Sequence, residues 1–310
     1  MTLLAALKGG TPIEGVYAVR RKERRLSRQG RPFLALTLAD ASGSVRAVVL
    51  DEPDFFGDQF EEGDRIRVAG RVSERAGKHE VLVTHLRPAA DEAAAEDLLP
   101  RAHRDPEELF GFVLHLADEV ADPGLRATLD ALTGDVALAR DWRTMPCTRS
   151  GHHAYLGGLV EHTVGAAALV QTLCTWHPRL DSDLLVTAAL VHDLGHARAF
   201  TLGATFELSE AGRLLGHLAL GHEIVDRAAA KAGLAEGRRL ALLHAIAWHH
   251  GPPAGQPPNG ASPEALALWR ANALEAGVKG RLEGPGPDAG MSPGTTAPAP
   301  ASAGAGSVRR

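Results

Sequence analysis

Ionisable side chains interrupt an apolar segment at residues 190–196, LVHDLGH, where His192 and Asp193 are adjacent and His196 follows. Burying groups that can carry charge is costly unless they are paired or coordinate a metal. Taken alone, the heptapeptide fits two interpretations equally well. One is a structural histidine beside a helix-terminal aspartate, with Gly195 ending the helix; the other is a functional site. The rest of the chain has to distinguish between them.

Histidine is concentrated in the region that contains this segment. Eleven of the fifteen histidines lie between residues 152 and 250, about a third of the chain. Several fall in apolar, helix-like segments, each near a glycine that permits close backbone approach. These are His162, His192 with its neighbour Asp193, His217, His249 and His250. One such histidine alone is more often structural, but their recurrence predicts a shared metal site.

The residue types fit a divalent transition metal. Imidazole together with carboxylate binds Mn, Fe, Co, Ni or Zn, and the lack of cysteine among these residues argues against a structural zinc site. His192 and Asp193 could both bind one metal near a helix end, or each could bind one of two metals, with Asp193 as a bridge. A metal or metal pair lowers the pKa of bound water and stabilises the oxygens of a phosphoryl displacement, so phosphate-ester hydrolysis is a chemistry that suits this pattern.

Length and composition set the frame for this site. The 310 residues suffice for two domains, and 45% hydrophobic with 23% charged residues is typical of a globular protein. The net charge of −5 argues against a generally basic nucleic-acid-binding protein, although it does not exclude a local basic face. Two cysteines, Cys147 and Cys174, form neither a disulfide framework nor a CxxC motif. With no signal-peptide core and no apolar run approaching about 18 residues, we expect a cytoplasmic protein.

The N-terminal 88 residues have the pattern of β-strands. Five runs rich in Val, Leu and Ile, several of them alternating apolar with polar residues, are separated by glycine-containing turns. The runs are residues 13–19, 32–40, 44–50, 64–72 and 79–86. Their number and spacing, with a longer excursion over 51–63, predict a five-stranded OB-fold β-barrel over residues 1–88.

A basic segment, RRKERRLSRQGR at residues 20–31, would occupy the first hairpin of that barrel. It has seven cationic residues in twelve, and Phe33 just after the turn offers a face for base stacking. We therefore expect the barrel to bind single-stranded RNA or DNA. The alternative is a solvated hairpin tip, with Phe33 in the core of the second strand. The candidate nucleic-acid contacts are Arg20, Arg21, Lys22, Arg24, Arg25 and Phe33.

The remainder of the chain has helical periodicity. Residues 89–105, rich in Ala and acidic side chains, suit a linker. Apolar residues at three- and four-residue intervals predict an all-α domain over residues 106–276. Its later helices are expected at 153–176, 182–194, 210–231, 236–250 and 262–275. Residues 277–310, rich in Gly, Pro, Ala and Ser, predict a disordered tail.

The series of motifs resembles the HD-domain metal-dependent phosphohydrolases, and more specifically the YhaM-type 3'-5' exoribonucleases, which join an OB-fold to an HD domain. The resemblance rests on GHHAYLGGLVEHT (151–163), ALVHDLGH (189–196), FELSEAGRLLGH (206–217), WHHG (248–251) and, in the barrel, GRPFLALTLADASGSVRAVVLD (30–51). It extends over about residues 12–276. It implies metal ligands at His162, His192, Asp193 and His217, with His249 and His250 completing a second site.

The resemblance also implies catalytic groups beside the metals. Asp193, His196 and Arg213 would be catalytic, and Arg149 is a second candidate for holding the scissile phosphate. His152 and His153 match the family pattern and would lie near the site.

Two positions depart from the family pattern. Asn272, in ANALEA (271–276), stands where the family has an aspartate ligand. Its carbonyl oxygen can still bind a cation, but without a negative charge it should do so more weakly. His196 replaces a lysine, and an imidazole is cationic only near or below its usual pKa of about 6.5.

The implied activity is 3'-5' exonucleolytic hydrolysis of single-stranded RNA, or of DNA, to nucleoside monophosphates. It would use one or two divalent ions, Mn first, with Fe, Co, Ni, Mg or Zn as alternatives. Two other interpretations stay open. One is an HD-type phosphohydrolase of a small nucleotide, which would not need the barrel. The other is a nucleic-acid-binding protein with a degenerate HD domain, which Asn272 supports. A homo-oligomer is compatible with all three.

Overall fold

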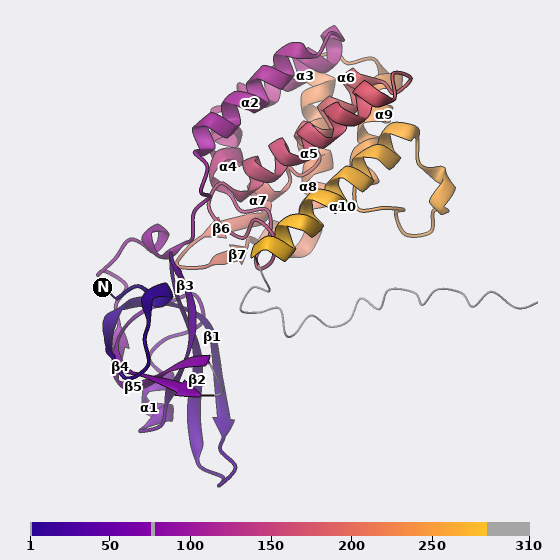
Figure 1. Cartoon of the computed structure of the whole chain (residues 1–310). Coiled ribbons are helices and arrows are strands. Elements are labelled where there is room, and N and C mark those ends of the chain that lie inside the picture. Colours follow the sequence, from indigo (N-terminus) through magenta and orange to yellow (C-terminus); the bar gives the residue numbers. More distant parts are fainter. Residues whose placement is uncertain (1, 76–77, 284–310) are drawn as a thin grey trace, which may run out of the picture.

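Five strands at the N-terminus close into a β-barrel. The computed structural model of the chain describes residues 2–75 and 78–283 (Figure 1). The strands are β1 (Pro12–Leu26), β2 (Pro32–Asp40), β3 (Gly43–Val49), β4 (Arg65–Arg75) and β5 (Lys78–Pro88). They pair in the order β1-β2-β3-β5-β4, and β4 pairs back onto β1. The β3–β5 pair is parallel and the others are antiparallel. The prediction of a five-stranded OB-fold barrel is confirmed.

Alternate apolar side chains along the strands fill the barrel interior. On β2, Leu34, Leu36 and Leu38 are at most 2% exposed and join one core cluster with Val and Ile side chains of the other strands. The two-residue period of a strand places such alternate side chains on one face. The 3-10 turn η1 (Leu4–Ala6) is tied to the barrel because the Leu4 N–H donates to Asp40 Oδ2 at 2.9 Å. A short helix, α1 (Pro53–Gly57), lies between β3 and β4.

Helices make up most of the second domain. They are α2 (Pro106–Glu119), α3 (Pro123–Thr133), α4 (Val136–Thr144), α5 (Gly158–Trp176), α6 (Ser182–Val191), α7 (His196–Ala199), α8 (Glu210–Lys231), α9 (Glu236–Ala247) and α10 (Pro263–Glu283). Aspartates begin four of them: the side chains of Asp105, Asp122, Asp135 and Asp181 accept hydrogen bonds from backbone N–H groups of the first turn. Such caps satisfy donors that a helix N-terminus leaves without an intrahelical partner.

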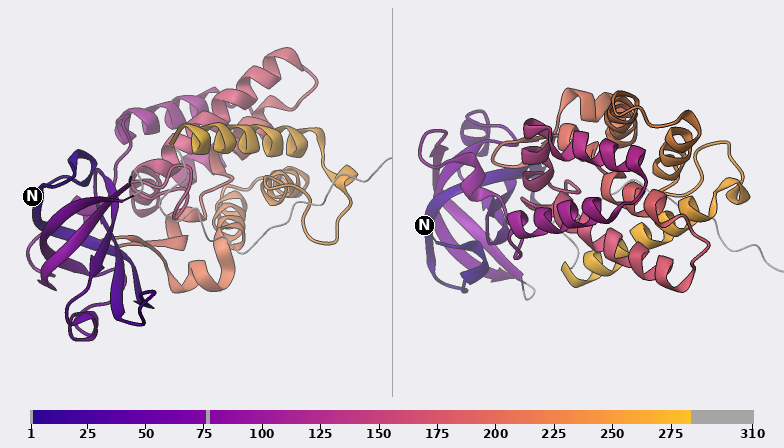
Figure 2. Two further views of the ribbon diagram at one scale, coloured as in Figure 1. Left: turned by 60° about the horizontal axis from the view of Figure 1, so that its bottom comes forward. Right: turned by 90° about the horizontal axis from the view of Figure 1, so that it is seen from above.

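Helix α6 lies at the centre of this domain. All its residues from Leu184 to Val191 are buried, and it packs against α5 and α9. A helix that is apolar on all sides requires such an enclosed position. Helix α10 packs along α5 (Figures 1 and 2). Among residues 2–75 and 78–283, no helix combines the length and the apolar character needed to cross a membrane.

Two predictions for this domain need correction. The domain is not entirely α-helical, because Phe200–Leu202 (β6) and Phe206–Leu208 (β7) form a small antiparallel hairpin. Strands of three residues are too short to show a clear alternation in the sequence. The disordered tail was also predicted to begin at residue 277, but α10 continues to Glu283. Residues 284–310, the remainder of that predicted tail, lie outside the described residues.

The segment predicted as a linker is packed against both domains. Leu98 clusters with barrel residues and with Ala204 of the β6–β7 hairpin, whereas Leu99 clusters with Leu156 and Phe206 of the helical domain. The backbone of this segment pairs with Leu156 on both sides, through the Ala102 N–H and the Pro100 carbonyl, each at 2.9 Å. The barrel therefore sits at the end of the helical domain where β6 and β7 lie (Figures 1 and 2).

Helices α7 and α8 approach each other closely at Gly195. A Cβ on Gly195 would lie 1.9 Å from the carbonyl oxygen of His217 and 2.7 Å from the backbone nitrogen of Gly221. The backbone of Gly195 has ordinary helical angles (φ −59, ψ −25), so the need for glycine here comes from space and not from conformation. This contact brings the chain after α6 against α8.

We predict that Gly195→Ala destabilises the protein by about 1–3 kcal/mol, because the backbones of α7 and α8 must separate to admit the methyl group. Gly111→Ala is the matched control, since Gly111 lies within α2 and its added Cβ would meet nothing within 4 Å. That control should gain up to about 1 kcal/mol from helix propensity. Urea unfolding of the two variants measures both changes. Equal stabilities would show that the close approach does not constrain the fold.

Candidate metal centre

A cavity of about 400 Å³ opens among the helix ends of the second domain, between α7, α8, the end of α9 and α10. Its lining includes Asp193, His196, His217, His249, His250 and Asn272. A larger cavity of about 960 Å³ lies beside Trp176 and Arg270. No candidate metal-binding cluster in the described part of the chain includes residues that line it. The smaller cavity is therefore the one lined by candidate metal-binding residues.

Several residues of this site lie at the ends or breaks of helices. Helix α6 ends at Val191, so His192 is its C-cap and Asp193 lies in the following turn, not inside a helix as the sequence suggested. Helix α8 is interrupted at Gly216, whose φ of +71 favours glycine, and His217 comes directly after this kink. His249 likewise follows the end of α9. At such points the backbone can turn a ring away from the helix axis.

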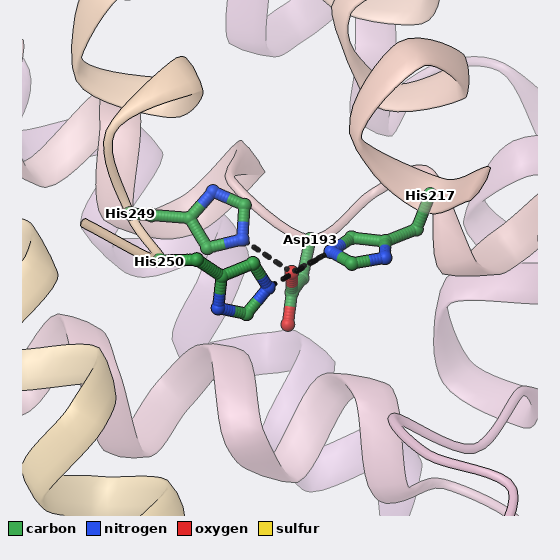
Figure 3. A group of neighbouring side chains, drawn as sticks. All are labelled: Asp193, His217, His249 and His250. Carbon is green, nitrogen blue, oxygen red and sulfur yellow. Dashed lines mark hydrogen bonds and ion pairs between the residues drawn. The ribbon is translucent and has the colours of Figure 1, made fainter. Parts of the chain in front are cut away.

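The Asp193 carboxylate is shared by two groups of histidines. Its Oδ1 lies 3.1 Å from His249 Nε2 and 3.7 Å from His217 Nε2. His250 completes this first group, since its Nε2 is 3.0 Å from His217 Nε2. Figure 3 shows these three rings converging on the carboxylate from two sides.

The second group faces the other carboxylate oxygen. Asp193 Oδ2 lies 3.4 Å from His162 Nε2 and 3.5 Å from His192 Nε2, and these two ring nitrogens are 3.2 Å apart. Asp193, His162 and His192 are all buried. Each group has the donor types and the spacing of a candidate metal site, and Asp193 belongs to both.

Hydrogen bonds at Nδ1 fix which ring nitrogen faces the centre. His192 Nδ1 lies 2.9 Å from the Ala189 carbonyl and His249 Nδ1 lies 2.6 Å from the Ile246 carbonyl. Both carbonyls are at helix C-termini, where the last turn leaves acceptors without a helical donor. Because a carbonyl can only accept, Nδ1 must donate, and each Nε2 keeps its lone pair. In this way two helix ends orient two metal-binding nitrogens.

The same reasoning supports a cation at this position. Asp193 Oδ1 and His249 Nε2 are buried and have no hydrogen-bond partner among the described residues, although they lie 3.1 Å apart. A carboxylate oxygen and an imidazole lone pair are both acceptors and cannot bond to each other. A divalent ion satisfies both, so the residues present fit a bound divalent metal.

Burial sets the protonation of the site. It lowers the pKa of His192 to about 3 and that of His250 to about 4, with Coulomb repulsion from His249 adding to both effects. Burial alone would raise the pKa of Asp193, but the surrounding imidazoles outweigh it and hold that pKa well below its usual range. Neutral imidazoles around an ionised carboxylate are the forms that bind metal.

Asn272 lies on α10 and lines the cavity. It is 5% exposed, and its Nδ2 donates to the His249 carbonyl at 3.0 Å. With the amide nitrogen bound there, the carbonyl oxygen is the end that contacts the site. Burial acts to lower the pKa of His162, but the hydrogen bond to Glu275, the nearby carboxylates and a hydrogen bond to Asn272 raise it. The amide orientation follows from this hydrogen-bond network.

Glu275 is a residue of the site that the sequence did not single out. Its Oε2 accepts from His162 Nδ1 at 2.5 Å and its Oε1 lies 2.8 Å from His153 Nε2. Burial acts to raise the pKa of Glu275, but the two imidazole hydrogen bonds lower it to about 2. A carboxylate behind a histidine ligand fixes its tautomer and orientation. The available signal was the three-residue spacing from Asn272, which puts both on one face of α10.

Other expected site residues lie at different distances from the centre. His196 stacks on the His217 ring at 4.1 Å between centroids, and its Nε2 is 3.9 Å from Asp193 Oδ1. Arg149 is exposed at the rim and lines the cavity. Arg213 is exposed on α8 and is not among the lining residues, so the structure does not bring it to the site. His152 lines the cavity as well.

One sequence inference about the site is incomplete, because a cysteine does lie in it. Cys147 is 1% exposed, and its Sγ lies 3.5 Å from Asp193 Oδ2. The residue is 46 positions before Asp193 and stands in a loop without an apolar periodic pattern, so nothing in the sequence connected it with the histidines.

The predicted nucleic-acid contacts of the barrel are mostly engaged with acidic or backbone groups. Lys22 Nζ donates to the carbonyls of Gly57 and Phe60, at 3.0 and 2.5 Å, and pairs with Glu61 at 2.7 Å. Its side chain is only 12% exposed, so Lys22 serves the barrel fold.

The other predicted contacts lie along the first hairpin. Arg24 pairs with Asp54 and Asp58, and Arg21 and Arg25 pair with Glu23. Phe33 is half-buried opposite Arg25, and Arg20 is half-buried on β1. The tip of the β1–β2 hairpin points away from the helical domain (Figure 1).

Comparison with known proteins gives the same two domains. Residues 16–89 match the OB-fold nucleic acid binding domain, and residues 159–277 match the HD domain. The chain is similar to the 3'-5' exoribonuclease YhaM of Bacillus velezensis, with 25% identity over 244 residues, which cover 78% of this chain and 77% of the relative. It is similar to the same enzyme of Bacillus subtilis, with 25% identity over 245 residues, 78% of this chain and 77% of the relative.

We predict that Glu275→Gln lowers the affinity for divalent metal about 10- to 100-fold, because the amide no longer holds His162 Nδ1 with a negative charge. Glu236→Gln, at an exposed position in the first turn of α9, should leave the affinity unchanged. Titration with zinc against a competing chelator measures both. Equal affinities for the two variants would contradict an orienting role for Glu275.

We predict that Asn272→Asp raises metal affinity at least about 10-fold by adding a negative charge among the donors. Asn272→Ala, which also loses the hydrogen bond to the His249 carbonyl, should lower it. Metal content after dialysis, measured by mass spectrometry, follows both. Unchanged occupancy in Asn272→Asp would mean that this side chain does not reach the metal.

Proposed function

Because this chain joins an OB-fold nucleic-acid-binding domain to an HD domain and is homologous to the YhaM 3'-5' exoribonucleases, we propose that it is a metal-dependent 3'-5' exonuclease. Its substrate is single-stranded RNA, or DNA, and its products are nucleoside monophosphates. The observation that carries the proposal is the buried Asp193 carboxylate shared by two histidine groups at an open cavity.

The donor set favours a transition metal. Five imidazoles surround one carboxylate, and imidazole suits ions such as Fe, Ni and Zn, whereas Mg prefers oxygen ligands. We propose one ion on each side of Asp193, with Mn²⁺ the first to test. Bound ions would supply an activated water and stabilise charge on the phosphate.

The protein's own residues position the substrate. Asp193, His152, His196 and Arg149 line the cavity, and the buried His162 and His192 contact the Asp193 carboxylate. Arg149 carries a permanent charge at the rim, and a guanidinium matches the geometry of a phosphate. We therefore assign phosphate binding to Arg149 and not to Arg213. The barrel holds the strand upstream of its 3' end, which a small nucleotide substrate would not require.

An inactive HD domain on a nucleic-acid-binding protein is the second candidate. It is favoured by Asn272, since one of the expected carboxylates is missing. Metal content and activity separate the two candidates. Our proposal retains a cytoplasmic location, which rests on the scarcity of cysteine in the sequence.

The test is incubation of the purified protein with 5'-labelled single-stranded RNA and DNA of one sequence, with each divalent ion in turn. We expect stepwise shortening from the 3' end and release of monophosphates, abolished by a chelator. Asp193→Ala should lower the rate by more than about 100-fold, because it removes the donor common to both groups. No shortening with any ion, beside a degraded positive control, would rule out the nuclease. Release of phosphate from small nucleotides alone would point to the nucleotide hydrolase.

Two arginines provide a matched pair for the phosphate contact. We predict that Arg149→Ala lowers kcat/KM about 100-fold, because a cation aimed at the phosphate is lost. Arg213→Ala, at an equally exposed position outside the cavity, should have little effect. A larger loss of kcat/KM in Arg213→Ala than in Arg149→Ala would place the phosphate on the α8 side of the site.

A further inference from the structure

Helix α10 forms an apolar wall on one side of the metal-site cavity. Trp269, Ala273 and Ala276 line the cavity together with Asn272. At 3.6 residues per turn, these four positions fall within an arc of about 100° around the helix axis, so they share one face of α10. Asn272 donates to the His249 carbonyl, whereas the other three side chains carry no charge. We refer to Trp269, Ala273 and Ala276 as the apolar wall.

Most of the other lining residues are polar. Asp193 and the histidines of the metal centre lie beside the wall, and Thr148, Arg149 and His152 come from the loop between α4 and α5. The volume of about 400 Å³ is in the lower part of the range of about 300–1,000 Å³ for small-molecule sites. The cavity therefore suits one nucleotide and not a longer segment of a strand.

Gly251 makes room for the indole of Trp269 beside the metal centre. A Cβ on Gly251 would lie 3.0 Å from two ring carbons of Trp269, Cε2 and Cζ2. Its φ of +102 also favours glycine. Gly251 ends the motif WHHG (248–251), whose two histidines belong to the metal centre. The last residue of the motif thus admits an aromatic ring beside these histidines, which metal binding by itself does not require.

Arg270 holds the same ring from another side chain of α10. Its guanidinium carbon lies 3.9 Å from the centre of the Trp269 ring, which is a cation–π contact. Trp269 is half-buried and lines the cavity, so part of its side chain stays accessible to a ligand. An aromatic group that is already held in place loses little conformational entropy when a ligand packs against it.

We propose that the apolar wall binds the base of the 3'-terminal nucleotide. The inference rests on the proposed exonuclease function and adds the contact that holds the base. A nucleotide has an apolar, planar base at one end and an anionic phosphate at the other, and the cavity has the same asymmetry. With the phosphate between the metal centre and Arg149, the base lies against Trp269, and the short side chains of Ala273 and Ala276 leave space for it.

The wall should accept any base. Ala273 and Ala276 have no side-chain donor or acceptor, and every base has a π-face that can pack against an aromatic side chain. A contact of this kind supplies affinity without reading the sequence. An exonuclease that removes successive nucleotides requires a terminal site with this tolerance.

The first experiment compares adenosine 5'-monophosphate with ribose 5-phosphate, which lacks the base, as ligands of the Mn²⁺-loaded full-length protein. Calorimetric titration of the wild type should show at least about 10-fold tighter binding of the nucleotide. Trp269→Ala should lose this difference and keep its affinity for ribose 5-phosphate. Trp176→Ala is the matched control and should behave as the wild type, since Trp176 is 78% exposed at the end of α5 and does not line the cavity.

Ala273→Leu tests the same site without removing the aromatic ring. Ala273 is exposed at the cavity, so a larger side chain there occupies the space for the base without disturbing the buried core. This variant should bind adenosine 5'-monophosphate about 10-fold more weakly and ribose 5-phosphate as tightly as the wild type does. Ala168→Leu, at an exposed position of α5 outside the cavity, should change neither affinity.

The second experiment separates contact with the base from a structural role of Trp269. In the wild type, the first cleavage at a 3'-terminal abasic residue should have a KM about 10-fold above that at an ordinary residue. Trp269→Ala should raise the KM for the ordinary substrate to the same value, with kcat little changed, because the lost contact is equal in the ground and transition states. The abasic substrate should cause no further increase in this variant. Additive increases in KM would show that Trp269 acts through the fold and would overturn the proposal.

The other outcomes separate the base site from the proposed function. Equal wild-type affinities for the nucleotide and ribose 5-phosphate would refute the base site, and stepwise shortening of RNA would still support the exonuclease. A preference for the nucleotide that both Trp269→Ala and Ala273→Leu retain would place the base elsewhere. If the preference is lost in these variants but the wild type shortens no strand, the base site is supported and the exonuclease is refuted in favour of a hydrolase of small nucleotides.

Discussion

The buried carboxylate of Asp193 is the group on which the helical domain depends. Its side chain is 4% exposed, and burial lowers the pKa of His192 and His196, two of the imidazoles that face it, to about 3. A buried charge without a counterion costs several kcal/mol even after the surroundings relax. A divalent ion bound at the carboxylate would remove that cost. Metal binding and the stability of this region are therefore two aspects of one equilibrium.

Helix termini do much of the positioning around this carboxylate. Helices α6 and α9 each end in the same local arrangement, in which a ring Nδ1 bonds to the carbonyl three residues earlier. A backbone carbonyl that has no helical donor at the helix end thus fixes the tautomer of the histidine ring. His162 differs, because it lies in the second turn of α5 and is oriented by Glu275 from α10. Backbone carbonyls at helix ends therefore orient His192 and His249, and the carboxylate of Glu275 orients His162.

Much of this could be predicted from the sequence, and the parts that could not have identifiable causes. The five strands follow from two-residue alternation, and the site histidines stand out because they interrupt apolar helices. The ends of α6 and α9 were placed too late, because the histidines after them continue the apolar pattern. Glu275 and Cys147 were missed for a different reason. Each acts through one contact with a residue far away in the chain, at separations of 113 and 46 residues, and local spacing carries no trace of such contacts. Lys22 shows the opposite error, since a cation in a basic run was taken as a ligand contact and is instead bound to carbonyls of its own barrel.

The β6–β7 hairpin has a consequence for how the two domains communicate. It starts at Phe200, whose ring stacks on His196 at 5.5 Å, and at its turn Ala204 packs among barrel residues and Leu98. Any displacement of the barrel must bend this hairpin or carry it along, and the hairpin ends against a side chain of the cavity wall. In the proposed nuclease, a strand bound on the barrel and an ion bound at Asp193 would be coupled if strand binding displaced this hairpin, and thermodynamic reciprocity requires that each would then change the affinity for the other by the same factor. The hairpin is therefore the element through which the two proposed sites would be linked.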